Sequence, residues 1–168
     1  MPDAREFGLE GFGCDAHEVP SNPAHAEATG IDIPSGVAVS RVASVPVRHG
    51  MMPSVAYRIE RDGRSIAYSG DVAEGSDALI ALAQDCDVLI HDAALPEREV
   101  PHGELHAKPS QIGKVAARAR CRTLVLSHIM PELEDELDDA LRLIRESYAG
   151  ERIVAHDLLT LPLKRASA

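Results

Sequence analysis

Three residues with metal-binding side chains each follow an apolar run of this sequence: His49, Asp71 and His128. The runs that precede them cover residues 37–47, 65–69 and 123–127. Imidazole and carboxylate groups are the ligands that Zn²⁺ takes in hydrolytic sites, and they also suit Mn²⁺ and Fe. Because strand ends hold side chains more rigidly than loops do, we expect these three ends to meet in one metal site. If two ions were bound, each would have about two protein ligands from this set, fewer than the three usual at catalytic zinc.

The elements that must position these side chains can be predicted from local patterns. Asp62-Gly63 lies between two alternating runs, 54–60 and 65–69, which is a strong signal for an antiparallel hairpin. A short buried strand is predicted over Asp87–His91, and one or two more over 153–155 and 158–163. Helices are predicted after the N-cap residue Ser76, from Pro109 to about Ala119, and from about Leu133 to Tyr148. Strands in a meander followed by strand and helix alternation indicate an α/β or α+β layer fold.

Composition and charge place the chain among single-domain globular proteins. The 168 residues are 45% hydrophobic and 26% charged, with a net charge of −10 and no dense run of Lys or Arg. Nucleic acid is therefore an unlikely partner for this chain, and so is an anionic membrane. Three cysteines without CxxC spacing indicate a reducing compartment. No signal peptide and no apolar run long enough for a membrane span is visible, so we expect a cytoplasmic protein.

The order of five motifs resembles the C-terminal half of the metallo-β-lactamase superfamily, most closely its ribonuclease Z-like and arylsulfatase-like branch. The motifs are His49 after a Val-rich strand, Tyr68-Ser69-Gly70-Asp71, Asp87-Val88-Leu89-Ile90-His91-Asp92-Ala93, His106 before a helix, and Leu124-Val125-Leu126-Ser127-His128. The resemblance covers roughly residues 37–163 and implies half of an αββα sandwich, with a mixed sheet and outer helices. Residues 1–36, which are rich in Gly and Pro, are expected to be an irregular segment before this half-domain of residues 37–168.

The resemblance also implies roles for individual residues. His49 would bind one metal ion, Asp71 would bridge two, and His128 would bind the other. His106 falls where the family has a catalytic histidine near the phosphate or leaving group. The cofactors would be two divalent ions, with Zn²⁺ favoured and Mn²⁺ or Fe possible. His91 would be a packing or supporting residue, and Asp92 stands where the family more often has Glu.

One family signature is missing from this sequence. The string His-x-His-x-Asp-His, which supplies four further residues in the first half of the family fold, occurs nowhere in the chain. A single half would also expose an apolar sheet face to water. The expectation is therefore a C-terminal piece, or a half-domain that pairs with a missing N-terminal half or a second copy. Alone it would be weakly active or inactive.

Two functions from different classes follow from this pattern. The first is a metal-dependent hydrolase of phosphoesters, sulfoesters or related esters, acting on a small-molecule or other ester substrate. The second is a non-catalytic half-domain that pairs with another subunit. A purely structural module has no need of metal ligands at three strand ends, which favours the hydrolase. A flavodoxin-like or receiver-like fold is disfavoured by the antiparallel hairpin at Asp62-Gly63.

Overall fold

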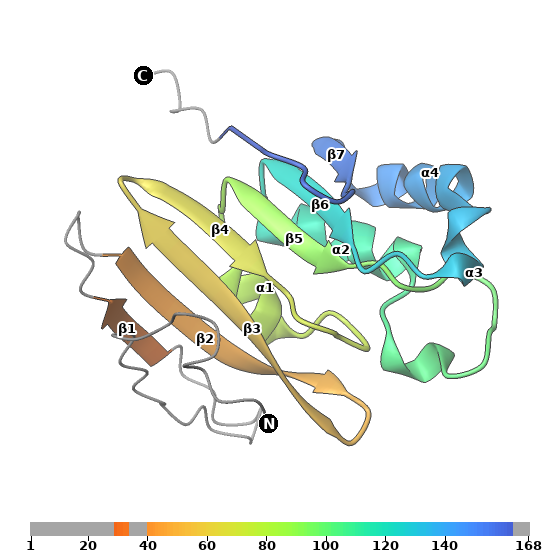
Figure 1. The fold of residues 1–168 in the computed structure, drawn as a ribbon, viewed down its shortest axis with the longest axis horizontal. Helices are drawn as coiled ribbons and strands as arrows, with labels where there is room; N and C mark the ends of the chain where they lie inside the picture. The colour runs from red at the N-terminus through yellow and green to blue at the C-terminus, as the bar shows by residue number, and fades with distance from the viewer. Residues whose placement is uncertain (1–28, 34–39, 163–168) are drawn as a thin grey trace, which may run out of the picture.

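The computed structural model describes residues 29–33 and 40–162 (Figure 1). Within them, one mixed sheet contains the strands β1 (Thr29–Ile33), β2 (Ser40–His49), β3 (Met52–Arg61), β4 (Arg64–Tyr68), β5 (Val88–Asp92), β6 (Thr123–Ser127) and β7 (Glu151–Val154). The helices are α1 (Asp77–Leu82), α2 (Pro109–Ala119), α3 (Pro131–Glu134) and α4 (Leu137–Ser147). A short 3-10 turn, Gly103–Leu105, precedes α2. The strands lie in the sheet in the same order as in the sequence.

The sheet changes from antiparallel to parallel at β4. Strands β1 to β4 pair antiparallel, and β4 to β7 pair parallel. The predicted hairpin joins β3 to β4, with a positive φ at both Asp62 (52°) and Gly63 (71°), as the tight turns of hairpins require. Since β4, β5 and β6 run parallel, their C-terminal ends meet at one edge of the sheet, which is where Asp71 and His128 follow.

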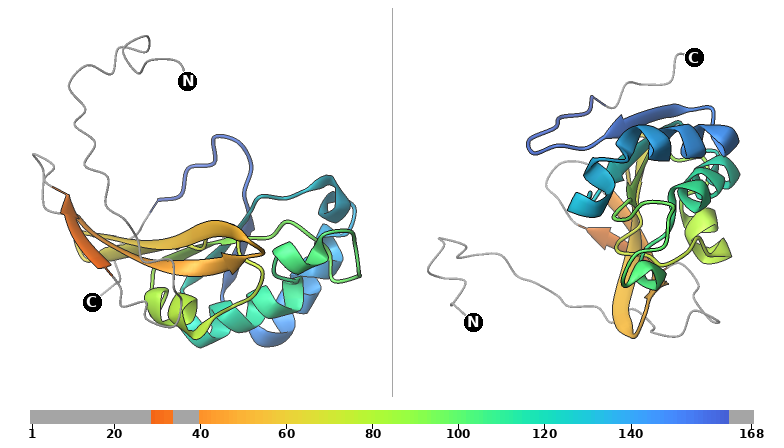
Figure 2. Two further views of the ribbon diagram at one scale, coloured as in Figure 1. Left: turned by 90° about the horizontal axis from the view of Figure 1, so that it is seen from below. Right: turned by 90° about the vertical axis from the view of Figure 1, so that its right-hand side faces the viewer.

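Helices α1, α2 and α4 cover one face of the sheet (Figure 2). Alternate residues of the strands point into the core between these layers, and Ala67, Leu89 and Leu124 are completely buried there. Helix α2 packs against α4 and presents the buried Ile112, while Ile144 does the same from α4. No helix in the described part of the chain has both the length and the hydropathy needed to cross a bilayer.

The opposite face of the sheet carries large apolar side chains that remain partly open to solvent. Tyr57, Ile59 and Tyr68 are 40%, 45% and 43% exposed, and the strand registers place them on the face away from the helices. Water tolerates such a face poorly when the apolar area is large. Exposed apolar side chains on one sheet face are what the sequence analysis expected of a single half of an αββα sandwich.

The structure differs from the sequence-based prediction in three places. Thr29–Ile33 forms the edge strand β1 inside the stretch 1–36 that was expected to be irregular, because β2 supplies its hydrogen-bonding partner; residues 1–28 lie outside the described part. The helix predicted from Leu133 to Tyr148 is divided into α3 and α4 at Glu136, whose φ and ψ of −116° and 15° are not helical. Neighbouring acidic side chains repel one another there. No strand forms over residues 158–162.

Buried cysteines provide a test of the core. Cys86 is 1% exposed, and desolvation raises the pKa of its thiol to about 12. Because the thiolate is the reactive form, alkylation of Cys86 by iodoacetamide at pH 8 should be at least about 100-fold slower in the folded chain than in urea. Peptide mass spectrometry measures this rate at Cys86 itself. Equal rates in the two states would contradict the burial described for Cys86.

Candidate metal centre

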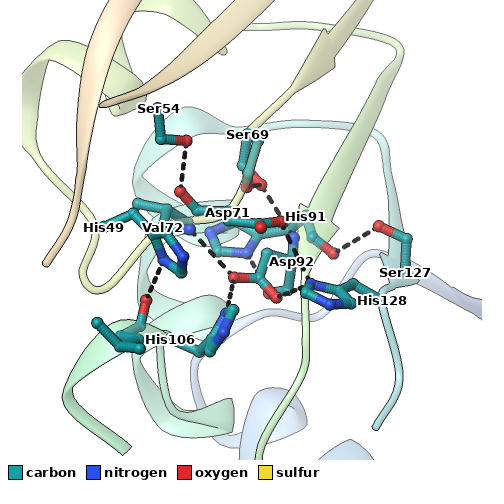
Figure 3. A network of polar contacts seen from close by, with 12 residues as sticks. His49, Ser54, Ser69, Asp71, Val72, His91, Asp92, His106, Ser127 and His128 are labelled. Atoms are coloured by element: carbon teal, nitrogen blue, oxygen red, sulfur yellow. Dashed lines mark hydrogen bonds and ion pairs between the residues drawn. The ribbon is translucent and has the colours of Figure 1, made fainter. Parts of the chain in front are cut away.

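The four residues predicted to act in the site come from four separated segments and meet at one edge of the sheet (Figure 3). His49 is the last residue of β2, and Asp71 follows β4 on the Ser-Gly-Asp turn. His106 precedes α2, and His128 directly follows β6. The structure therefore brings together all four residues singled out in the sequence. It also places Asp92, the last residue of β5, in their midst.

Backbone hydrogen bonds tie the segments of the site to one another. The amide of Ala73 donates to the carbonyl of Arg48 at 2.7 Å, which fixes the loop after Asp71 beside the end of β2. The amide of Ala107 donates to the carbonyl of Val72 at 2.8 Å, which fixes His106 beside the same loop. The amide of Ala93 donates to the carbonyl of Ser127 at 2.9 Å. Backbone hydrogen bonds between neighbouring segments thus hold the residues that carry the functional side chains in place.

Gly70 shapes the turn that presents Asp71. Its φ is +62°, and an added Cβ would lie 2.6 Å from the carbonyl oxygen of Val55 and 3.1 Å from the hydroxyl of Ser54. That same hydroxyl donates a hydrogen bond of 2.7 Å to the carbonyl of Asp71. Only glycine combines this conformation with so close an approach. The carboxylate of Asp71 is left 43% exposed at the rim of the site.

The centre of the network is the carboxylate of Asp92, whose side chain is 1% exposed. Its Oδ2 accepts hydrogen bonds from the amide of Val72 at 3.1 Å and from Nδ1 of His106 at 2.6 Å. Its Oδ1 has no hydrogen-bond partner among the described residues. Sequence reasoning noted Asp92 only as a departure from the family pattern. Alternation along β5 indicates that His91 and Asp92 point to opposite faces of the sheet, but it does not tell which of the two faces the site.

His91 precedes Asp92 on β5, so its side chain lies on the opposite face of the sheet, where it is completely buried. Its Nδ1 donates to the backbone carbonyl of Asp92 at 2.6 Å. Burial lowers the pKa of its imidazole, against an opposing contribution from that hydrogen bond and from the charge of Asp92. A neutral, buried ring on the core side of the strand has the packing role that the sequence indicated.

His128 adopts a left-handed backbone conformation, with a φ of 58°, and its ring faces two carboxylates. Its Nδ1 lies 3.2 Å from Oδ1 of Asp71 and 3.4 Å from Oδ1 of Asp92. Potential ligand atoms of His128, Asp92 and His106 all lie within 4.8 Å of one another. Two imidazoles and one carboxylate that converge at this spacing have the composition of a site for a divalent cation.

His49 is oriented in the way that metal-binding histidines usually are. Its Nδ1 lies 2.9 Å from the carbonyl of Leu105, and its ring centroid lies 5.0 Å from that of His106. A carbonyl can only accept, so Nδ1 carries the hydrogen and Nε2 is left with a free lone pair. Ligating histidines commonly donate their second ring N–H to such a partner. The residues present therefore fit a divalent metal ion.

Two further histidines of the described chain, His102 and His156, do not take part in this cluster. His102 is exposed and has a positive φ of 60° beside the 3-10 turn. His156 and Asp157 are exposed, and the Nδ1 of this histidine hydrogen-bonds to the carbonyl of its neighbour. No hydrogen bond or ion pair in the described part of the chain joins His102, His156 or Asp157 to the site.

A family model described as a beta-lactamase superfamily domain matches residues 12–129, which is more than half of the chain. The protein therefore belongs to the metallo-β-lactamase superfamily, as the order of its motifs indicated. Within the superfamily it is similar to ribonuclease Z. It is 29% identical over 143 residues to ribonuclease Z of Methanosarcina acetivorans, covering 82% of this chain and 46% of that protein. It is 28% identical to the Bacillus subtilis ribonuclease Z, covering 94% of this chain and 54% of that protein.

Solved structures show the same fold. The metallo-beta-lactamase fold protein YhfI from Bacillus subtilis superimposes with a TM-score of 0.61 at 19% identity, covering 69% of this chain and 47% of that one. The short form of human tRNase Z superimposes with a TM-score of 0.58 at 22% identity, covering 74% and 42%. The chain spans about half the length of the curated relatives it matches.

Proposed function

We propose that this chain supplies one half of a metal-dependent phosphodiester hydrolase of the ribonuclease Z type. The observation that carries the proposal is the meeting of His49, Asp71 and His128 at one sheet edge, with His106 between the two other histidine rings at 5.0 and 5.2 Å. A fold alone hosts many functions, so the proposal rests on these side chains. Phosphodiesters are preferred to sulfoesters because the relatives at sequence level are named ribonuclease Z.

The residues that would hold divalent ions are His49 through Nε2, Asp71 and His128. Their nitrogen and oxygen donors suit Zn²⁺, and also Mn²⁺ or Fe. Divalent ions in such a site polarise an ester and lower the pKa of a water molecule toward neutrality. The described residues offer fewer ligands than two catalytic ions take, so further ligands must come from a second half.

His106 is placed to move a proton. Its Nδ1–H is held by Oδ2 of Asp92 at 2.6 Å, which fixes the ring and leaves Nε2 on the edge turned away from that carboxylate. A proton on Nε2 would pass to the leaving oxygen as the ester bond breaks. The carboxylate of Asp92 would stabilise the imidazolium form before that transfer, as an acid does when it orients a catalytic histidine.

The second half would pack against the open sheet face that carries Tyr57, Ile59 and Tyr68. These side chains are 40 to 45% exposed, and burying them against a second sheet would complete an αββα sandwich over the half-domain of residues 37–168. The site lies at the end of that face, since Asp92 alternates with Ile90 on β5. A second half could thus reach the metal ligands.

The expectation about nucleic acid, which was drawn from the net charge, needs a correction. Nucleic acid was expected to be an unlikely partner because the net charge is −10, but the comparisons do not support that expectation, since the relatives are named ribonuclease Z. Net charge describes the whole surface of one chain and not the groove that a second half would form. RNA is accordingly the substrate that we place first.

A chimera tests this function. The part of Bacillus subtilis ribonuclease Z that this chain does not match would be joined to the chain, and hydrolysis of an RNA oligonucleotide and of bis(p-nitrophenyl) phosphate would be followed with Zn²⁺ or Mn²⁺. The chain alone should be weak or inactive and the chimera active. His106→Ala should lower kcat of the chimera by about 100-fold to 10,000-fold with unchanged metal content.

The matched control is His102→Ala, because His102 is an exposed histidine of the same loop and should leave kcat unchanged. A chimera that binds two ions and cleaves neither substrate would contradict the proposal and favour a non-catalytic half-domain. Hydrolysis by the pure chain, lost in Asp71→Ala, would overturn the statement that a second half is required.

A further inference from the structure

One atom of this site, Oδ1 of Asp92, has no function in the mechanism proposed above. The side chain is 1% exposed, yet both N–H donors that reach it, from Val72 and His106, bind Oδ2. Oδ1 is buried with no hydrogen-bond partner among the described residues. A buried carboxylate oxygen without a donor or a cation is costly, so native proteins rarely leave one.

The surroundings of this oxygen show what could satisfy it. Nδ1 of His128 lies 3.4 Å from this oxygen and 3.2 Å from Oδ1 of Asp71. Donor atoms bound to a tetrahedral zinc ion at about 2.0–2.2 Å lie about 3.3–3.6 Å apart. Both measured separations are close to this range.

We infer that Asp92 is itself a metal ligand through Oδ1, on the side of the site formed by Asp71 and His128. This inference rests on the proposed metal site and adds to it a ligand that the family resemblance does not assign. Asp92 and His128 belong to a group of three described residues, with His106, whose potential ligand atoms all lie within 4.8 Å of one another, and Oδ1 of Asp71 lies 3.2 Å from Nδ1 of His128. The chain should therefore bind one divalent ion with its own residues.

The two oxygens of Asp92 have separate tasks in this arrangement. Oδ2 is fixed by the amide of Val72 and by Nδ1 of His106 at 3.1 and 2.6 Å, which aims Oδ1 at His128. Ligating carboxylates are themselves usually held by hydrogen bonds of this kind. His106 is thus a partner of the ligand in this half-site and keeps its own Nε2 free.

The Asp92→Asn variant distinguishes a metal ligand from a residue that only orients His106. The asparagine oxygen would occupy the Oδ2 position, because the amide of Val72 requires an acceptor there, and the NH₂ group would replace Oδ1. The acceptor for His106 is retained and the metal ligand is lost. Titration of the full-length chain with Co²⁺, followed by visible absorption and calorimetry, reports affinity and coordination together.

The expected result is that Asp92→Asn weakens Co²⁺ binding at least about tenfold and changes the absorption spectrum at saturating metal. The matched control is Asp87→Asn, which makes the same charge change just before β5, where Asp87 accepts from the amide of Ser65 at 2.8 Å; its metal affinity should equal that of the wild type. If Asp92→Asn does not fold, Asp92→Glu keeps the charge, and its longer side chain should also shift the spectrum.

Three results would overturn the inference. The first is a wild-type chain that binds no Co²⁺, and the second is an Asp92→Asn variant that keeps the wild-type affinity and spectrum. In the third case Asp92→Asn binds Co²⁺ more weakly with an unchanged spectrum, which would indicate that Asp92 acts only through its charge from a distance. Failure here can be told from failure of the proposed function. If metal binding depends on Asp71 but not on Asp92, only the inference about Asp92 is contradicted. If metal binding depends on both residues and the chimera cleaves no phosphodiester, only the proposed function is contradicted.

Discussion

Asp71→Asn should lower the affinity of the chain for Zn²⁺ at least about 100-fold, above the loss typical when an outer-shell partner is removed. The reason is the position of the carboxylate, whose Oδ1 lies 3.2 Å from Nδ1 of His128 on a turn fixed by the bond from Ser54 to its carbonyl at 2.7 Å. Asparagine keeps the size of the side chain and removes its charge. Isothermal titration with Zn²⁺ measures the change.

Asp62→Asn is the control for this substitution. Asp62 is exposed in the hairpin turn with a φ of 52°, a conformation that asparagine also tolerates, so the charge changes while metal affinity should not. Equal affinities for the Asp71→Asn variant and the wild type would show that zinc is bound elsewhere, and the proposed site would then be wrong.

Gly70→Ala should destabilise the protein by about 2 to 5 kcal/mol, the sum of left-handed strain and overpacking. A Cβ at this position lies 2.6 Å from the carbonyl oxygen of Val55, which belongs to β3 and cannot move without disturbing the sheet. Because Asp71 is the next residue, metal affinity should fall as well. Urea unfolding gives the free energy, and zinc titration of the folded variant gives the affinity.

Gly63→Ala separates the contribution of left-handed backbone strain from that of overpacking. Gly63 has a φ of +71° but a Cβ there meets no atom within 4 Å, so only the strain of about 1 to 2 kcal/mol should appear. Metal affinity should stay at the wild-type value because the hairpin turn lies at the other end of β4. If Gly70→Ala destabilised no more than Gly63→Ala, the close approach to Val55 would not limit this turn.

Much of the fold could be predicted because local signals and tertiary structure agree. Asp62-Gly63 forms the expected hairpin, Ser76 caps α1 by accepting from the amide of Leu79 at 3.2 Å, and Pro109 begins α2. Edge strand β1 could not be predicted, since its residues Thr29–Ile33 lie in a segment rich in Gly and Pro and become a strand only through pairing with β2. Tertiary pairing often overrides such weak local patterns.

The site was predictable at the strand ends and less so within a strand. His49, Asp71, His106 and His128 each stand where an apolar run ends or a helix begins, which is visible in the sequence. Asp92 is adjacent to His91, and nothing in composition says which of the two faces the site. That choice depends on the parallel register of β5 with β6, in which His91 pairs with Leu126 of the core and Asp92 with Ser127.

Native mass spectrometry of the purified chain during a Zn²⁺ titration tests the central claim most directly, because it counts subunits and bound ions in one experiment. The predicted result is one Zn²⁺ per chain from the ligands of this half, lost in Asp71→Asn, and a further ion only in assemblies that contain a second half. A chain that remains metal-free throughout the titration, or that keeps its zinc in Asp71→Asn, would contradict the claim that these strand ends form half of a metal centre.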